Sequence, residues 1–199
     1  MILAIKLTER DINIFKIIAK VGSISRGMLD DDFKMERRSI YRLTKGDDAF
    51  LKVHNTTIKK GKKVVNQYTY SFTEKGAEYA IENHLCRAVQ GFNGYEHSLQ
   101  AERTIKELLD SGLDVSSIYN EKEQEIIFRD EIKKMKDLDK VKKRKDSSFA
   151  VVDFAYYNED KQLNLIEIET KNYRPKLRKQ HSTYAKNLNA NYTVIRYKK

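Results

Sequence analysis

Apolar residues in the first patterned stretch of the chain, 7–22, recur three or four positions apart. This spacing is typical of an amphipathic helix that buries one face. Thr8 followed by Asp11 is the pattern of a capping box at the start of such a helix, and Gly22 stands where it would end. The first predicted element is therefore a capped helix.

Two shorter helices are predicted next, and then the period changes. The segment SRGMLDDDF would be capped by Ser23 or Ser25, and KMERRSIYRLTK predicts a third helix over 34–45. Residues 49–73 then alternate apolar and polar positions on both sides of the turn KKGKK, which predicts a β-hairpin. A further capped helix is predicted in 73–83.

Gly91 and Gly94 mark the predicted boundary between two domains, 1–90 and 91–199. The chain of 199 residues is long enough for two domains of this size. The second domain would open with an amphipathic helix over 98–111.

That opening helix would be capped by Ser98 and stopped by Gly112. Residues 113–148 allow two interpretations: one helix throughout, or a strand at EIIFRD before a basic helix or loop. The run KVKKRK in this region is expected to be a solvated, mobile segment.

Apolar and polar residues alternate again in the stretch AVVDFAYYNEDKQLNLIEIETKNY, and this alternation predicts two strands joined by a polar turn. Charged residues interrupt both strands, Asp153 in the first and Glu167, Glu169 and Lys171 in the second. Because side chains alternate across a sheet, the last three share one face. A three-residue turn centred on Asp160 would set Asp153 opposite Glu167 and diagonal to Glu169.

The composition narrows the classes of partner. The formal net charge of +10 and the isoelectric point near 9.4 indicate a protein that meets a polyanion, with an ordinary lysine-rich surface as the alternative. Cys86 is the only cysteine, which excludes a disulfide framework and a cysteine-based zinc site within one chain. No apolar run approaches the ~18 residues of a membrane span, so a cytoplasmic location, with the nucleoid or a plasmid, is expected.

Other kinds of chemistry find less support. No glycine-rich phosphate loop and no serine or cysteine nucleophile motif is found, which argues against ATP use and against hydrolysis through such a nucleophile. His54, His84 and His181 show no ligand spacing with one another. His97 and Glu102, at the start of the predicted helix 98–111, are expected on the helix surface.

Three helices, a basic hairpin and a closing helix resemble the winged helix-turn-helix family over about residues 7–84. The resemblance implies a domain that binds double-stranded DNA, with the third helix in the major groove and the wing on the phosphates. A compact α+β domain with no nucleic-acid role is the alternative. The residues predicted to contact DNA are Arg37, Arg38, Tyr41 and Arg42 on the helix and Lys59, Lys60, Lys62 and Lys63 on the wing.

The acidic strands predict a metal site. Carboxylates on a partly buried strand repel each other, and a divalent cation removes that cost. Mg²⁺ is usually held by one or two carboxylates together with water and phosphate oxygens. We therefore expect Mg²⁺ or Mn²⁺ on Asp153 and on Glu169 or Glu167, with Lys171 orienting water or neutralising developing charge. A surface hairpin with a Glu169–Lys171 ion pair and no metal is the alternative.

Asp153 followed by Glu169-Thr170-Lys171 resembles the motif of the PD-(D/E)xK nucleases, the restriction-endonuclease-like superfamily. The resemblance implies an α/β domain with an αβββαβ core, and an α+β class for the whole chain. It also implies that Asp153, Glu169 and Lys171 are catalytic. The first strand of that core would lie somewhere in 118–130.

Helix 175–188 and strand 191–198 would complete this core. Gln180 and Tyr184 share one face of that helix and resemble the QxxxY motif of the exonuclease branch, which implies a catalytic role. Val152 stands where the family motif has proline.

A winged helix joined to a nuclease-like domain, with IEIETKNYRPKLRKQHSTY after the hairpin turn, resembles the replication-relaxation family of bacterial plasmids and other mobile elements. The resemblance implies a role in DNA replication, relaxation or transfer, together with other DNA-processing proteins. Two hypotheses stay open: a metal-dependent DNA endonuclease or nickase, and a non-catalytic DNA-binding regulator or accessory factor. A homodimer would suit a palindromic site, although no heptad seam supports one.

Overall fold

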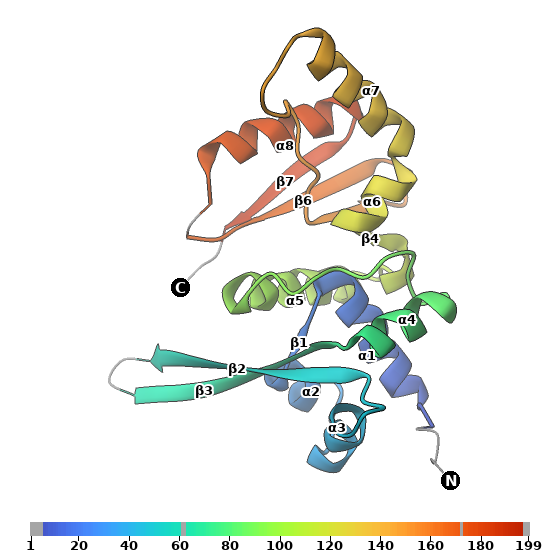
Figure 1. The fold of residues 1–199 in the computed structure, drawn as a ribbon, viewed down its shortest axis with the longest axis vertical. Coiled ribbons are helices and arrows are strands. Elements are labelled where there is room, and N and C mark those ends of the chain that lie inside the picture. Colours follow the sequence, from blue (N-terminus) through green and yellow to red (C-terminus); the bar gives the residue numbers. More distant parts are fainter. Residues whose placement is uncertain (1–5, 61–62, 172, 197–199) are drawn as a thin grey trace. The chain divides into compact units, whose positions relative to one another are not determined.

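The strands form two separate sheets, one in each part of the chain (Figure 1). The computed structural model describes residues 6–60, 63–171 and 173–196, apart from the side chains of Lys59 and Lys60. The chain divides into two compact units, Met1–Ser111 (unit 1) and Gly112–Lys199 (unit 2). Both units combine helices with strands, so the α+β class is confirmed. No described helix is both long and apolar enough to cross a membrane.

Unit 1 is built mainly of helices around a small sheet. Its elements in chain order are α1 (Glu9–Val21), β1 (Ile24–Ser25), α2 (Arg26–Asp31), α3 (Arg37–Thr44), β2 (Leu51–Lys60), β3 (Lys63–Phe72), α4 (Glu74–Glu82) and α5 (Tyr95–Asp110). The central strand β3 pairs antiparallel with β1 on one side and β2 on the other.

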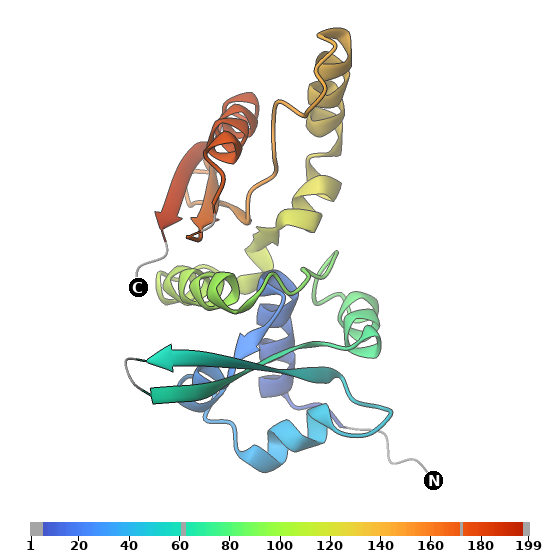
Figure 2. The ribbon, with the colours of Figure 1, turned by 60° about the vertical axis from the view of Figure 1, so that its left-hand side comes forward.

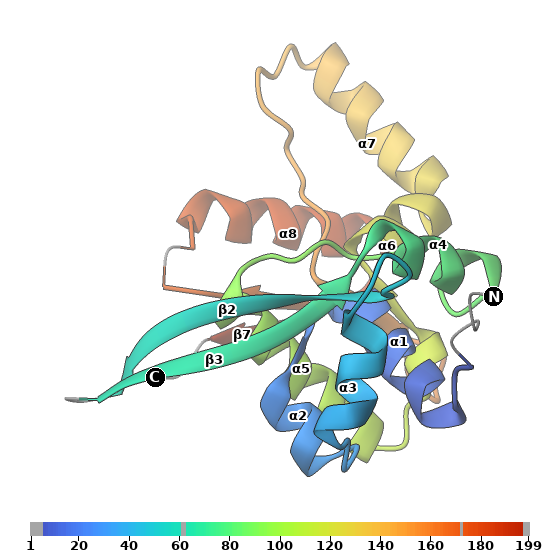
Figure 3. The same cartoon turned by 60° about the horizontal axis from the view of Figure 1, so that its bottom comes forward.

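The predicted hairpin is confirmed by the pairing of β2 with β3. The two strands pair over their whole length, from Leu51 opposite Phe72 to Lys60 opposite Lys63. Figure 3 shows the hairpin projecting past the helices of unit 1. Its turn lies outside the described residues.

The predicted helix caps of unit 1 are largely confirmed. The Thr8 hydroxyl accepts a hydrogen bond from the Asp11 backbone N–H, and the Asp11 carboxylate accepts one in return from the Thr8 backbone N–H. Gly22 ends α1 with φ of 89°, a conformation that glycine adopts without strain. Ser25 caps α2, whereas α3 begins three residues after its predicted start, beyond Lys34 with φ of 47°.

Aromatic rings join the helices of unit 1 to its sheet. Phe15 of α1 is fully buried, and its ring lies edge-on to Phe72 of β3 at 5.2 Å and to Tyr79 of α4 at 6.1 Å. Phe50, directly before β2, contacts the same ring at 5.7 Å. This cluster fixes the helices against the base of the hairpin.

The helix α5 belongs to unit 1, so the division falls after this helix and not before it at 90/91 (Figure 2). α5 packs on α1 and β1, and its buried Glu102 accepts a hydrogen bond from the backbone N–H of Ser25. The helix starts at Tyr95 after Gly94, so the predicted cap at Ser98 is wrong. The surface position predicted for Glu102 is wrong as well.

Unit 2 contains a four-stranded sheet with helices packed against it. Its elements are η1 (Val115–Ser117), β4 (Ile118–Asn120), α6 (Glu121–Ile127), α7 (Arg129–Val141), β5 (Phe154–Tyr157), β6 (Leu163–Glu169), α8 (Pro175–Asn187) and β7 (Asn191–Arg196). The strand order is β4-β5-β6-β7, antiparallel for the first two pairs and parallel for β6 with β7.

The segment EIIFRD is helical, so the strand interpretation of this segment is wrong. Asn120 and Glu123 form a reciprocal capping box that starts α6 directly after the short strand β4. The buried Gln124 side chain donates a hydrogen bond to the Val152 carbonyl at 2.8 Å, which fixes this helix to the sheet. A strand does lie within 118–130, as expected, at its first three residues.

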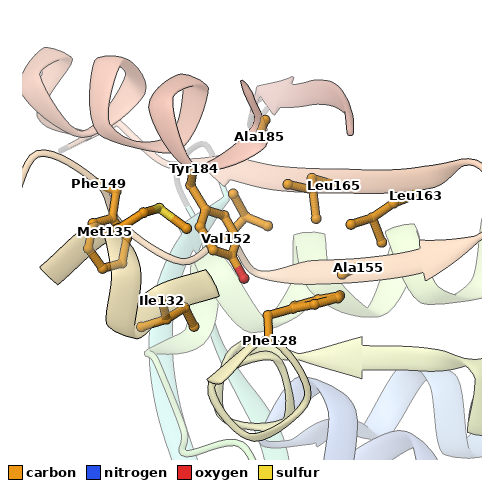
Figure 4. Packing of buried hydrophobic residues seen from close by; sticks show 10 residues of the cluster. All are labelled: Phe128, Ile132, Met135, Phe149, Val152, Ala155, Leu163, Leu165, Tyr184 and Ala185. Atoms are coloured by element: carbon orange, nitrogen blue, oxygen red, sulfur yellow. The ribbon is translucent and has the colours of Figure 1, made fainter. Parts of the chain in front are cut away.

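Ten apolar side chains form the core of unit 2 (Figure 4). Leu163 and Leu165 of β6 and Ala155 of β5 face Tyr184 and Ala185 of α8 in this cluster. Phe128, Ile132 and Met135 of the α6–α7 segment pack against the same cluster from another side. Helix α8 therefore covers one face of the sheet.

Candidate functional site

The β5–β6 register brings Asp153 opposite Glu167, as predicted. Phe154 pairs with Ile166 and Ala155 with Leu165, and one more step of this register sets Asp153 opposite Glu167. The Asp153 carboxylate accepts a hydrogen bond from the backbone N–H of Ile168 at 2.7 Å. This bond holds the carboxylate against β6 just before β5 begins.

The sheet face that carries the acids changes character along β6. Leu163 and Leu165 lie in the hydrophobic core, whereas Glu167 and Glu169 follow on the same face with only 7% and 6% of their surfaces exposed. Because side chains alternate along a strand, all four point toward the face that α8 covers. Two carboxyl groups are therefore buried where the apolar core ends.

Helix α8 changes character in step with β6. Tyr184 and Ala185 pack on the apolar part of the strand, His181 lies beside Glu167, and Arg178 lies beside Glu169. These α8 residues are spaced three or four apart, so they share one helix face. Glu167 therefore lies beside His181, and Glu169 lies beside Arg178, one turn nearer the start of α8.

Glu169 is fully engaged by guanidinium groups. Arg178 donates from Nε and from an Nη atom to the two carboxylate oxygens, each at 2.6 Å, and Arg196 of β7 lies at 3.5 Å. The hydrogen bonds and charge of Arg178 hold the pKa of Glu169 below its usual range. A carboxylate bound in this bidentate way is not available as a metal ligand unless Arg178 moves away.

Glu167 has the opposite environment. Its burial first, and the neighbouring negative charge of Asp153 second, raise the pKa of Glu167 to about 10. The Nδ1 atom of His181 lies 3.4 Å from Glu167 Oε1 and 2.7 Å from the Tyr173 hydroxyl oxygen. Burial lowers the pKa of His181, so this imidazole is neutral at pH 7 and does not compensate the acids.

The three residues of the predicted catalytic motif therefore have different surroundings. Asp153 lies beside Glu167, Glu169 is held by Arg178, and Lys171 is exposed, two residues after β6 ends. Among the described residues, no group of three or more His, Cys, Asp and Glu side chains could hold a metal ion. The pair of acids that faces one another is Asp153 with Glu167.

Gln180 and Tyr184 do not join the acidic pair. Tyr184 is fully buried in the core of unit 2, where its ring stacks on Phe149 at 6.2 Å, and burial raises the pKa of its hydroxyl. The Gln180 amide donates a hydrogen bond to the Ser147 carbonyl, on the side of α8 away from the sheet. The spacing of the predicted motif is present, but here it serves packing and loop attachment.

On α3, the predicted DNA-contacting residues divide into two groups. Arg37, Arg38 and Tyr41 are exposed, and the Lys45 ammonium lies 4.8 Å from the centre of the Tyr41 ring. Arg42 instead binds the fully buried carboxylate of Asp11 on α1 at 2.6 Å and the Lys6 carbonyl at 2.9 Å. Arg42 thus anchors α3 inside unit 1, whereas Arg37, Arg38 and Tyr41 form the exposed face of this helix.

The predicted wing contacts can be placed only in part. Lys63 is exposed at the start of β3. Lys62 lies outside the described residues, as do the side chains of Lys59 and Lys60. Val53, Val64 and Tyr68 are exposed along the hairpin, with relative exposures of 41% or more.

Sequence reasoning missed four residues near the acids of β6: Tyr173 and His181 beside Glu167, and Arg178 and Arg196 beside Glu169. The spacing of Arg178, His181 and Tyr184 on one face of a helix that follows the acidic strand was the available signal. No family model, curated protein or solved structure matches the chain.

Proposed function

We propose that the protein binds double-stranded DNA through unit 1, which has the arrangement of a winged helix-turn-helix domain. The order of three helices, a hairpin whose inner strand also pairs with a two-residue strand, and a closing helix supports this proposal. The observation that carries it is the division of α3 into two faces. Ile40 and Leu43 are buried, Arg42 is anchored to Asp11, and Arg37, Arg38 and Tyr41 remain exposed.

On this proposal the two parts of unit 1 have different roles. Exposed arginines on a helix in the major groove can bind guanine through two hydrogen bonds each, which gives sequence discrimination of about 1–3 kcal/mol per contact. Lysines on the wing would neutralise phosphates and add affinity without sequence choice. The resemblance to replication-relaxation proteins points to the DNA of a plasmid or another mobile element as the target.

The experiment that tests DNA binding compares variants of α3 by fluorescence anisotropy on a labelled duplex library. Arg37→Ala and Arg38→Ala should each weaken binding to the preferred sequence by roughly 5- to 150-fold, the equivalent of about 1–3 kcal/mol. Lys75→Ala on α4, which removes a half-exposed lysine that pairs with Asp48, serves as the control outside α3. Equal losses in all three variants would contradict reading of the sequence by α3.

Cleavage of DNA by unit 2 is the second candidate function, and the Asp153–Glu167 pair favours it. The sheet order β4-β5-β6-β7, with α8 between the parallel strands β6 and β7, supports this candidate, whereas α6 and α7 stand between β4 and β5 where the expected core has no helix. In this chain the helix expected before the first strand, α5, packs with unit 1. The bidentate Arg178–Glu169 pair favours instead a non-catalytic domain.

The acidic pair fits a divalent cation better than the motif glutamate does. Glu167 is buried and faces Asp153, and burial together with the neighbouring charge of Asp153 raises the pKa of Glu167. A divalent cation bound between the two carboxylates would offset their repulsion. Asp153 and Glu167 would hold Mg²⁺ or Mn²⁺, which acidifies bound water and stabilises charge on a phosphoryl oxygen. Lys171 lies at the exposed end of this strand, where it could contact a phosphate.

A plasmid-nicking assay tests cleavage. Supercoiled DNA is incubated with the protein and Mg²⁺ or Mn²⁺, beside Asp153→Asn, Glu167→Gln and Lys171→Ala. Asp160→Asn, in the exposed β5–β6 turn, is the matched control. Nicking that is lost in Asp153→Asn and Glu167→Gln but kept in the control supports an active site. Duplex binding without nicking under any of these conditions would support the non-catalytic function.

A further inference from the structure

A groove outside the acidic pair lies between the end of α7, the segment 142–148 and the outer side of α8. It has a volume of about 770 Å³ and is open to solvent. Six basic side chains line it, against two acidic ones, Asp139 and Asp146. The basic residues are Lys142, Arg144, Lys145, Lys176, Lys179 and Lys186.

The segment 142–148 is fixed in place by hydrogen bonds. The Asp139 carboxylate accepts hydrogen bonds from the Ser148 backbone N–H at 2.8 Å and from Arg144 at 3.1 Å. Gln180 of α8 donates to the Ser147 carbonyl, and Lys176 of α8 pairs with Asp146. The segment 142–148 is therefore attached to both helices, and the groove has defined walls.

The two acids of the groove are already neutralised by Arg144 and Lys176. Four lysines remain, Lys142, Lys145, Lys179 and Lys186, and none of these has an ion-pair partner within 4 Å among the described residues. Like charges that gather in a concavity raise the local potential and attract an anion with several charges. The charge of the residues that line the groove thus favours the binding of a polyanion.

Helix α8 separates this groove from the acidic pair. Residues 176, 179, 180, 183 and 186 face the groove, whereas 178, 181, 184 and 185 face the sheet. The basic surface thus has its own side of the helix. A ligand in the groove need not contact Asp153 or Glu167.

The chemistry of the lining indicates which part of a nucleic acid is bound. None of the described residues that line the groove is aromatic, and the apolar ones are Met135 and Leu138. Sites for single strands combine positive charge with aromatic rings that stack on bases. Lysines without such rings suit the phosphates of a duplex, in which the bases are already stacked.

We propose that this α7–α8 groove binds the phosphodiester backbone of double-stranded DNA. It is a second contact surface, in a different unit from α3, and it does not depend on cleavage. Each lysine that contacts a phosphate displaces condensed counterions, so its contribution is visible in the salt dependence of binding.

The test uses the full chain and a matched pair of triple variants. In the groove variant, Lys142, Lys179 and Lys186 are changed to Ala. In the control, Lys122, Lys133 and Lys136 are changed, which are exposed on α6 and α7 and do not line the groove. Binding to a duplex of random sequence is measured by fluorescence anisotropy from 50 to 300 mM salt, roughly the range where phosphate contacts dominate. Thermal unfolding checks that all variants fold.

The groove variant should lower the slope of log K against log salt by about 2–3, close to 0.9 per lost phosphate contact. The control variant should leave the slope near that of the parent. Equal slopes for parent and groove variant, or equal losses in both triple variants, would overturn the proposal. A larger loss on a single strand than on the duplex would also overturn it.

Repeating the measurement with Arg37→Ala and Arg38→Ala separates this proposal from the one for unit 1. If α3 does not bind DNA, these two changes leave the affinity unchanged, and the groove variant still lowers the slope. If the groove does not bind DNA, the α3 changes alone weaken binding.

Discussion

The outer face of α3 and the acidic end of β6 are both rich in charge, but the two regions handle it differently. On α3, Arg37 and Arg38 remain exposed to water, where an unpaired charge costs little. On β6, Glu167 and Glu169 are buried, and each takes its partner from elsewhere in unit 2. Charged side chains on an exposed helix stay available to a ligand. On a buried strand, the neighbouring side chains determine whether a charged group is paired or protonated.

The same contrast appears within each region. Arg42 differs from Arg38 because it faces Asp11, and Glu169 differs from Glu167 because it faces Arg178. Residues of the same type in one short segment therefore differ in role: some are held in ion pairs within the unit, and others are not. Substitutions at these positions separate the charged groups that stabilise the fold from those that are available to a ligand.

The largest expected effect on stability is at Arg42. Replacing it with alanine leaves the fully buried Asp11 carboxylate without its guanidinium partner, so Arg42→Ala should destabilise unit 1 by about 3 kcal/mol. Arg38→Ala, on the exposed face, should change stability by less than about 0.5 kcal/mol. Urea denaturation followed by circular dichroism measures both, and equal effects would erase the distinction between the two faces.

A somewhat smaller effect is expected at Arg178. Its side chain is 47% exposed, so Arg178→Ala should destabilise unit 2 by less than Arg42→Ala destabilises unit 1. Adding Glu169→Gln removes the uncompensated charge and should restore more than half of the loss. A double-mutant cycle of denaturation midpoints measures this coupling, and additive effects would show that the ion pair contributes little.

Glu167 should make stability depend on pH. Its pKa is about 10 in the folded chain against 4.5 as the ordinary value, so the folded state keeps a proton that the unfolded state loses. This contribution to stability is complete below about pH 4.5 and declines as the pH rises toward 10, by at most about 1.4 kcal/mol per pH unit. Glu167→Gln should flatten the decline, and denaturation of both proteins from pH 5 to 9 measures it. Parallel curves would contradict a protonated Glu167.

The smallest energetic signal is expected from proton release. If a divalent cation binds Asp153 and Glu167, Glu167 must lose its proton, so Mn²⁺ binding at pH 7 should release about one proton. Calorimetry in two buffers of different ionisation enthalpy counts it. Glu167→Gln should bind Mn²⁺ without this release or not at all, and binding by the parent chain with no proton release would place the cation elsewhere.

The local pattern of the sequence was enough to predict the hairpin register. Alternation and the length of the turn determine which residues oppose each other in an antiparallel pair, so Asp153 could be set opposite Glu167. The capping box at Thr8 and the end of α1 at Gly22 are similarly local. Predictions of this kind depend on residues only a few positions apart.

The partners of the charged groups could not be predicted in this way. The pairing of Arg178 with Glu169 and the burial of Tyr184 depend on which side of α8 meets the sheet, which is decided by packing across unit 2. The attachment of α5 to unit 1 likewise depends on Glu102 reaching Ser25 across a long stretch of chain. The resemblance to the QxxxY motif implied a catalytic role for Tyr184, whereas the fold uses this residue in the core.

Ser25 has a mechanical consequence for unit 1. This one residue pairs with Thr69 of the hairpin, caps α2 through its hydroxyl, and donates its backbone N–H to Glu102 of α5. It is therefore a joint at which the hairpin, the helix-turn-helix and the last helix of the unit meet. Ser25 therefore links the hairpin to α5, the segment that leads along the chain into unit 2, beside the direct hydrogen bond from the Tyr95 hydroxyl of α5 to Gln67 of β3.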